Sequence, residues 1–254
     1  MSFNLMSFLM EKRPCSIAVL PWPAHLRLLV LAPHPDDFDA IGVTLRFLMQ
    51  KGNTLDVVVS RTGSGVEDEY RPGLNLEGKA DLRECEQRAS LRFFGLPESC
   101  MEFLSFDNDM GDQLIDNPAN LAKIEKVLQE KSPDLVFLPH GNDTNSGHQA
   151  MHSLFKQAAP RCGRPFVAFL NRDAKTVAMR TDVYLPFGPD QARWKGELLR
   201  FHDSQQQRNL RTRGSGFDDR VMQLNARTAG ELHISELYSE AFEMECYTMP
   251  AEKL

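Results

Sequence analysis

Apolar residues along the chain gather in short continuous runs, separated by longer stretches with helical spacing. Continuous runs of this length are typical of strands buried on both faces of a sheet. The runs at 135–139 and 166–170 are uninterrupted, whereas those at 26–31, 55–59, 101–106 and 176–185 contain polar residues; all six predict strands.

The stretches between these runs carry apolar residues every three or four positions, as on one face of an α-helix. They predict helices over 39–49, from about 79 to a stop at Gly95, from Pro118 after the cap Asn117, from His148 onward, over 194–201 and over 217–226. Strands that alternate with helices form a mostly parallel sheet. We therefore expect an α/β fold, a Rossmann-like three-layer sandwich with a mostly parallel sheet and helices on both faces.

The chain is long enough for one full core, since 42% of its 254 residues are hydrophobic. We expect an N-terminal extension over residues 1–25 and a single domain over 26–254. The first ten residues are partly apolar, but charges at 11–13 interrupt them and no small-residue cleavage site follows. We expect this extension to pack on the domain or on a second subunit, which leaves a homo-oligomer open. No run approaches the ~18 apolar residues of a membrane span.

Net charge and cysteine content indicate which kind of partner and which cellular compartment to expect. The net charge of -6 argues against nucleic acid as a partner, because phosphate binding needs a basic surface. A small-molecule partner is expected instead. The five cysteines are odd in number and lack CxxC spacing, so they favour neither a disulfide framework nor a thiolate metal site. We therefore expect a protein of the reducing cytoplasm.

Candidate chemistry lies where the strand at 26–31 runs into His34, Asp36 and Asp37. Open α/β sheets bind their ligands at the carboxyl ends of strands. A hydrolytic metal site needs imidazole and carboxylate ligands and a nearby base that does not bind the metal. His34 and Asp37 are candidate ligands and Asp36 the base. A third ligand is required, and His148 offers it, because it ends the loop after the strand at 135–139.

Each half of this site also has an ordinary structural explanation. Pro-Asp-Asp before an apolar helical run is a common helix start, and a single histidine at a helix start is more often structural or solvated. The two together, both at strand ends of one predicted sheet, favour the metal site.

Two other motifs compete with this interpretation. Residues 63–65, Gly-Ser-Gly, follow the second strand, but a dinucleotide site needs three glycines that open a helix after the first strand. This loop is expected to form one wall of the substrate pocket instead. Residues 37–39, Asp-Phe-Asp, have the spacing of a magnesium-dependent aspartate phosphatase. That site needs its first Asp directly after the strand, and it would leave His148 without a role.

In the motif at residues 33–37, PHPDD, and in the later loop that ends in His148, the chain resembles the PIG-L/LmbE-like zinc-dependent N-deacetylases. The signature of that family is AHPDDE with a later HPDH. Arg83 and Glu86 match the family's RxxE helix, and Gly95 and Leu96 its Leu-Gly turn. Weaker agreement is found at Lys195, at 204–205 and over 238–242, so the resemblance is strong over about 26–159 and thin beyond. It implies zinc on His34, Asp37 and His148, with Asp36 as general base, as the residues themselves suggest.

The chain departs from the family pattern at two places. Phe38 replaces the usual Glu, and Asn145, Ser146 and Gly147 replace the His-Pro-Asp that precedes the last ligand. The first His of that motif polarises the substrate carbonyl or protonates the leaving amine, so its absence bears on rate and substrate rather than on the metal.

The resemblance implies a hydrolase that removes an acetyl group from the amine of an N-acetylated amino sugar or its conjugate. Candidate substrate contacts are Asn145, Arg71 in the loop after the second strand, and His140 in the same strand-end loop as His148. The departures leave a second hypothesis, a non-catalytic module that binds metal and sugar without turnover. The acceptor stays open among a free sugar, a thiol conjugate, a lipid-linked glycan and an antibiotic.

Overall fold

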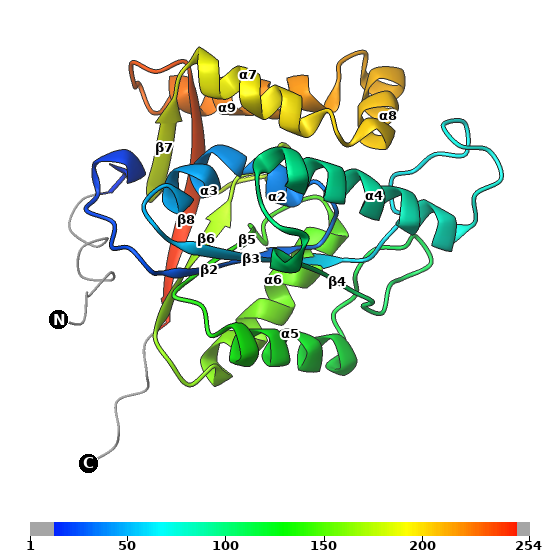
Figure 1. Ribbon diagram of the computed structural model, residues 1–254, viewed down its shortest axis with the longest axis horizontal. Helices are drawn as coiled ribbons and strands as arrows, with labels where there is room; N and C mark the ends of the chain where they lie inside the picture. Colours follow the sequence, from blue (N-terminus) through cyan, green and yellow to red (C-terminus); the bar gives the residue numbers. More distant parts are fainter. Residues whose placement is uncertain (1–12, 248–254) are drawn as a thin grey trace.

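The structure is a computed structural model, and it describes residues 13–247. Eight strands form one sheet in the order β1-β7-β8-β6-β5-β2-β3-β4, and β8 alone runs antiparallel to its neighbours (Figure 1). The strands are β1 (Cys15–Ser16), β2 (Arg27–Ala32), β3 (Thr54–Ser60), β4 (Met101–Leu104), β5 (Leu135–Pro139), β6 (Phe166–Asn171), β7 (Val183–Phe187) and β8 (Tyr238–Tyr247).

Helices cover both faces of this sheet. The α-helices are α2 (Asp37–Ala40), α3 (Gly42–Met49), α4 (Leu76–Phe94), α5 (Pro118–Lys131), α6 (Ser146–Ala158), α7 (Pro189–Leu199), α8 (Asp203–Arg213) and α9 (Phe217–Glu231). Short 3-10 turns lie at Ile17–Val19, Glu98–Cys100 and Ala159–Arg161. In Figure 1, α5 and α6 lie below the sheet, whereas the other helices lie above it. The predicted three-layer α/β fold is confirmed.

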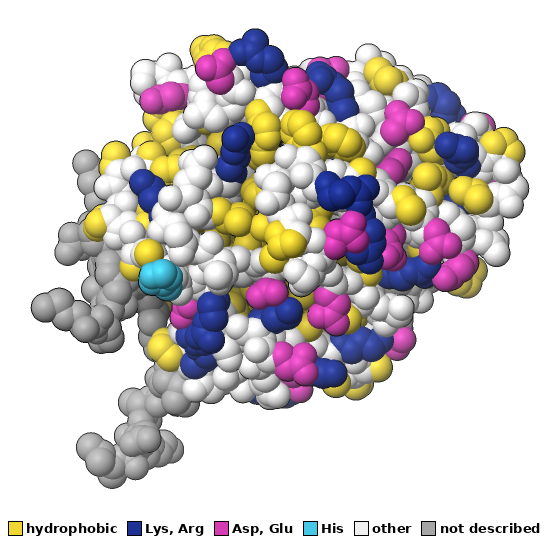
Figure 2. Space-filling model, in the orientation of Figure 1, with side chains coloured by type: hydrophobic (Ala, Val, Ile, Leu, Met, Phe, Trp, Pro, Cys, Tyr) yellow, Lys and Arg dark blue, Asp and Glu magenta, His cyan; other side chains and the backbone are white. Residues whose placement is uncertain are grey.

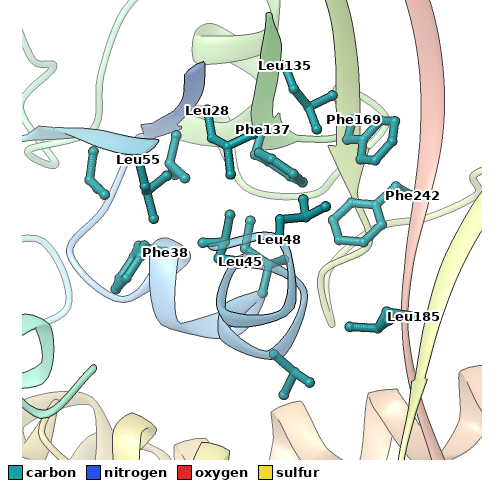
Figure 3. Packing of buried hydrophobic residues seen from close by; sticks show 14 of the residues in the cluster. Leu28, Phe38, Leu45, Leu48, Leu55, Leu135, Phe137, Phe169, Leu185 and Phe242 are labelled. Atoms are coloured by element: carbon teal, nitrogen blue, oxygen red, sulfur yellow. The ribbon is translucent and has the colours of Figure 1, made fainter. Parts of the chain in front are cut away.

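The central strands are buried on both faces because alternate side chains enter two separate cores. In β2, Leu28 and Val30 join the core under α2 and α3, whereas Leu29 and Leu31 join the core over α5 and α6. Figure 3 shows the first of these cores, where strand residues meet Phe38, Leu45 and Leu48. Each fully buried side chain of this kind stabilises the fold by about 1.5–3 kcal/mol.

Several predicted boundaries need correction. The strand predicted over 176–185 begins only at Val183, because residues 176–182 form a loop. The predicted helix over 39–49 is broken at Ile41 into α2 and α3, and the helix at 217–226 continues to Glu231. Helix α8 and strand β8 were not predicted.

The predicted N-terminal extension is described from residue 13 onward, and its first part, residues 1–12, lies outside the described residues. Cys15 and Ser16 pair with β7, and Ile17 is fully buried in the first core. The described end of the segment therefore packs on the domain.

Surface charges on the face shown in Figure 2 are mixed, with Lys and Arg side chains interspersed among Asp and Glu. None of the helices in residues 13–247 combines the length and the apolar character needed to cross a bilayer.

Phe38, which replaces the Glu usual in the resembled family, belongs to the core and not to the site. It is fully buried, and its ring centroid lies 5.0 Å from that of Phe94. Phe38→Ala is expected to lower the free energy of unfolding by about 3–5 kcal/mol, because it leaves a cavity. Urea unfolding of the metal-free protein measures this. Phe201→Ala is the matched control, since Phe201 is 37% exposed, and an equal loss in both variants would contradict the assignment.

Candidate active site

The candidate site lies where the direction of strand order changes. From β2 the chain moves outward to β3 and β4, whereas β5 and β6 lie on the other side of β2. Such a switch point leaves a crevice at the carboxyl ends of the two central strands. His34 follows β2, and His148 lies in the first turn of α6 after β5. The fold therefore brings together two histidines that are far apart in sequence.

Asp37 lies between the two histidines. Its Oδ1 is 3.3 Å from Nε2 of His148, and its Oδ2 is 3.2 Å from Nδ1 of His34. The backbone N–H of His34 also donates to Asp37 Oδ2 at 2.8 Å, which fixes the carboxylate. The three side chains offer donor atoms that all lie within 4.8 Å of one another.

These residues fit a metal ion in type and in spacing. Ligands at about 2.0–2.1 Å from a tetrahedral metal lie about 3.4 Å apart, close to the observed separations. Each histidine also has an outer partner of the kind that orients metal ligands. His34 Nε2 is 2.9 Å from Oε1 of Gln113, and His148 Nδ1 faces Oδ2 of Asp143 at 3.3 Å.

The electrostatics of His148 follow from its two carboxylate neighbours. Burial by itself would lower the pKa of His148, but Asp37 and Asp143 outweigh burial and raise it to about 10. Conversely, burial would raise the pKa of Asp37, whereas His148 and His34 hold it well below its usual range. Without metal, the site is a charged cluster of an imidazolium and two carboxylates.

This charge state predicts that metal binding releases a proton. A metal ligand must be a neutral imidazole, whereas His148, with its pKa raised to about 10, carries a proton at pH 7. Apparent metal affinity is therefore expected to fall about tenfold for each pH unit that the solution is made more acidic. Titration calorimetry in two buffers with different ionisation enthalpies counts the protons released. Affinity that does not change between about pH 6 and 7.5 would contradict this charge state.

Asp36 stands beside the donors but faces a different partner. Its Oδ2 accepts a hydrogen bond from Nη2 of Arg83 at 2.8 Å, and Arg83 itself is only 2% exposed. The same guanidinium donates to the carbonyl oxygens of Pro35 and Ser64. Burial raises the pKa of Asp36 although the charge of Arg83 opposes this. A buried carboxylate held in one orientation, close to metal donors but separate from them, suits a general base.

A buried hydrogen-bond network fixes the short helix α2 that carries these groups. The Asp36 N–H donates to Gln87 Oε1 at 2.9 Å, Gln87 donates to Asp39 at 2.8 Å, and His202 Nε2 is 2.5 Å from the same Asp39 oxygen. Asp39 is fully buried and so cannot reach a substrate. The alternative of an aspartate phosphatase built on residues 37–39 is therefore wrong.

Asn145 lines the pocket and also caps α6. Its Oδ1 accepts hydrogen bonds from the N–H groups of Gly147 and His148 at 2.8 and 3.3 Å. The amide nitrogen donates to no side chain or carbonyl within residues 13–247. Gly147 leaves room for Gln113, because a Cβ at 147 would lie 3.0 Å from Gln113 and from His34. The departures at 145 and 147 therefore change the pocket wall and leave the donors in place.

The other residues that the sequence suggests for the substrate pocket differ in whether they line it. Ser64 lines the pocket, as expected for the Gly-Ser-Gly loop. Arg71 is exposed on that loop, and His140 lies 3.3 Å from Glu243; neither lines the pocket, so the structure does not bring them to the site. No helix opens directly after residues 63–65, since α4 begins at Leu76, which removes the dinucleotide alternative.

Sequence reasoning missed several pocket residues. Gln113 lies in the loop before α5, and Asp173 and Lys175 lie in the loop after β6. Asp173 also forms a second group of possible donors with Asp143 and His148. In the sequence, Arg83 stands out only as a match to the RxxE helix of the resembled family. Its burial could not be read from a helix pattern in which apolar residues mark the inner face.

Comparisons with known proteins show the family and the fold to which this site belongs. The PIG-L family (GlcNAc-PI de-N-acetylase) matches residues 29–159, slightly more than half of the 254 residues. The comparison with curated proteins finds no match.

Three similar solved structures share the fold. N,N'-diacetylchitobiose deacetylase from Pyrococcus horikoshii has a TM-score of 0.69 and 17% identity over 86% of this chain and 83% of that one. A deacetylase of teicoplanin biosynthesis has a TM-score of 0.63 and 17% identity, over 87% of this chain and 98% of that one. GalB, the 4-carboxy-2-hydroxymuconate hydratase from Pseudomonas putida, has a TM-score of 0.62 and 18% identity, over 92% of this chain and 100% of that one. At identities of 17–18% these likenesses show the fold alone. Among the three proteins, two are deacetylases and one is a hydratase.

Proposed function

The chain belongs to the PIG-L family of GlcNAc-PI de-N-acetylases, and from this premise we propose that it is a zinc-dependent hydrolase that removes an acetyl group from the amine of an N-acetylated amino sugar or its conjugate. The observation that carries the proposal is the set of His34, Asp37 and His148 in one pocket with the separately held Asp36. The deacetylases among the similar structures support the same chemistry.

Zinc suits this donor set better than magnesium or calcium. Two imidazole nitrogens and one carboxylate are typical of catalytic zinc, whereas magnesium and calcium prefer oxygen ligands. Held by His34, Asp37 and His148, the ion would lower the pKa of a water molecule in the pocket toward about 7 and polarise an amide carbonyl.

The protein groups carry the proton transfers. The Asp36 carboxylate accepts a proton from the water whose oxygen bonds to the acetyl carbon. As the carbon–nitrogen bond breaks, the same carboxyl returns that proton to the departing amine. Arg83 keeps Asp36 in one orientation through both steps. In this proposal the amide N–H of Asn145 donates to the amide oxygen as negative charge develops there.

Released acetate tests the proposal. The zinc-loaded protein is incubated with N-acetylglucosamine, its glycosides, N,N'-diacetylchitobiose, N-acetylglucosamine 1-phosphate and N-acetylmuramic acid, and acetate and new primary amine are measured together. Equal amounts of both, formed at least about 10²-fold more slowly by the Asp36→Asn variant, are the expected result. A protein that keeps one zinc per chain but releases no acetate from any of these would overturn the proposal. It would favour the non-catalytic module or another reaction of this fold, as in the hydratase.

Asn145 gives a prediction that separates capping from catalysis. Asn145→Ala is expected to reduce kcat on the order of 10²-fold by removing an oxyanion donor, and to destabilise α6 by about 1 kcal/mol by removing its cap. Asn145→Ser restores a good cap without the amide donor, so it should regain the stability and not the rate. Rates are compared on one verified substrate, and unfolding is followed by urea. Unchanged kcat in both variants would make Asn145 a cap only.

A further inference from the structure

Three arginines from the helical layer above the sheet line the same pocket as the metal donors. Arg208 and Arg213 lie on α8, and Arg220 lies in the first turn of α9. We call these three residues the arginine cluster. The proposed reaction at Asp36 does not use them.

A neutral, buried side chain holds two of these guanidinium groups. Oδ1 of Asn209 accepts hydrogen bonds from Nη1 of Arg220 at 2.7 Å and from Nη1 of Arg213 at 3.1 Å. Asn209 is 4% exposed, and its own amide donates to the Gln205 carbonyl at 2.7 Å. The two arginines are therefore positioned by an acceptor that carries no charge.

The cluster lacks the counter-charges that most arginines of this protein have. Within residues 13–247, no carboxylate lies within ion-pair distance of Arg213 or Arg220. Arg208 has only Glu67, 3.8 Å from its Nε, and Glu67 is bound more closely by Arg211 at 2.6 Å. Arg208 and Arg220 are partly buried, whereas Arg213 is exposed. Partly buried cations that remain unpaired are unfavourable.

The surrounding charges leave the pocket wall positive. Lys175 lines the same pocket, and Asp173 is the carboxylate there besides Asp36 and Asp37. Partial burial and the charges of Arg213 and Arg208 lower the pKa of Arg220, with Asp173 opposing them. The whole chain has a net charge of -6, so this concentration of positive charge is local, and a positive cleft attracts anions.

We propose that the arginine cluster binds an oxyanion, a phosphate or carboxylate group that the substrate itself carries, and so selects anionic N-acetyl sugars over neutral ones. Guanidinium groups match such oxyanions because their paired N–H groups reach two oxygens at once. This inference rests on the proposed function for the reacting end of the substrate. The metal donors bind at the acetamide, and the cluster binds the charged substituent of the same molecule.

The first test compares substrates. The zinc-loaded protein is assayed with N-acetylglucosamine, N-acetylglucosamine 1-phosphate and N-acetylmuramic acid, which are neutral, phosphorylated and carboxylated. An anionic sugar should have the higher kcat/KM, and whichever of the two is preferred identifies the oxyanion. In Arg213→Gln/Arg220→Gln this preference should fall about 100-fold, mainly through KM, since each lost contact to a charged group reduces affinity about tenfold or more.

Two further variants control the comparison. Arg193→Gln removes an exposed arginine of α7 that lies outside the pocket and pairs with Asp190, and it should keep the full preference. Arg213→Lys/Arg220→Lys keeps the charge but not the paired N–H groups, so it should restore part of the preference. A wild-type protein that prefers the neutral sugar, or a double glutamine variant that keeps the preference, overturns the inference.

A binding measurement separates this inference from the proposed function. Calorimetry follows N-acetylglucosamine 1-phosphate and inorganic phosphate binding to the full-length Asp36→Asn variant, with and without the double glutamine change, at two salt concentrations. Binding that weakens with salt and is lost in the double variant supports the cluster even if no sugar is deacetylated. Deacetylation of neutral sugars without any phosphate or carboxylate binding supports the proposed function and overturns the cluster.

Discussion

Replacing Asp36 with asparagine is expected to reduce kcat by about 10²- to 10⁴-fold while the protein keeps its metal. An amide cannot accept the proton of the attacking water, although it has the size and shape of the carboxyl group. Asparagine also tolerates the backbone, since Asp36 has a φ of 118°, in the left-handed region that Asp and Asn adopt more readily than most residues. Its side-chain oxygen can still accept from Arg83. Acetate release and metal content are measured on the same preparation.

Asp37→Asn is the matched control for this result. Asp37 lies within 3.3 Å of both histidine rings, so its replacement should lower metal content as well as rate. If both variants lose metal to the same extent, the division into base and ligand is wrong. If Asp36→Asn keeps its rate, the base is another group, and Asp173 on the pocket wall is the next residue to replace.

The pH dependence of the reaction has a defined sign. Burial raises the pKa of Asp36 despite the opposing charge of Arg83, and only the deprotonated carboxylate can accept a proton. The rate should therefore fall as pH decreases through that raised pKa. Because Asp36 and the nearby Asp37 interact, the acidic limb reports the group of charges together rather than one residue.

The parts of this fold that the sequence predicts are those in which one physical signal dominates. The strands β2, β5 and β6 are buried on both faces beyond the exposed Arg27, so their apolar runs at 28–32, 135–139 and 166–170 are uninterrupted. The helix start at Asn117 and Pro118 is set by local capping, and it is found where predicted. The candidate site is predicted from the same buried strands, because polar residues directly after such strands lie at the sheet edge where ligands bind.

The missed elements lack that signal. Helix α8 has the sequence DSQQQRNLRTR, and its buried positions are the polar residues Ser204, Gln205 and Asn209, so no apolar period marks its inner face. Strand β8 carries Glu240, Glu243 and Glu245, and Glu240 is buried against Lys195 at 2.7 Å. These elements are fixed by long-range pairing, which a local pattern does not contain. The arginine cluster was missed for the same reason.

Arg71 and His140 show a different limit. Both stand in loops that contribute a pocket residue, Ser64 in one and Asn145 in the other. Position in a loop does not determine where a side chain points, however, and these two point elsewhere. Sequence proximity therefore predicted loops that reach the pocket, but not which of their side chains line it.

Replacing His148 with alanine is expected to remove the metal, and with it the metal-dependent activity. His148 is the donor between Asp37 and Asp143, and its loss leaves two protein ligands, too few for a catalytic zinc site. Asp143→Asn keeps the donor and weakens only its orientation, so metal affinity should fall about 10- to 100-fold. Metal content after dialysis and a competition titration with a chelator measure the two effects.

His152→Ala is the control on the same helix, because His152 lies one turn beyond His148, is half-buried and does not line the pocket; it should keep the full metal content. Asp173→Asn tests the second donor group, which shares His148 with the first. If Asp173→Asn loses the metal and Asp37→Asn keeps it, the ion binds between Asp143, His148 and Asp173, and the assignment of His34 and Asp37 is wrong. If His148→Ala itself keeps a full complement of metal, neither group is the site. The expected order of metal loss, with His148→Ala and Asp37→Asn greatest, Asp143→Asn intermediate and His152→Ala without effect, is specific to a site centred between β2 and α6.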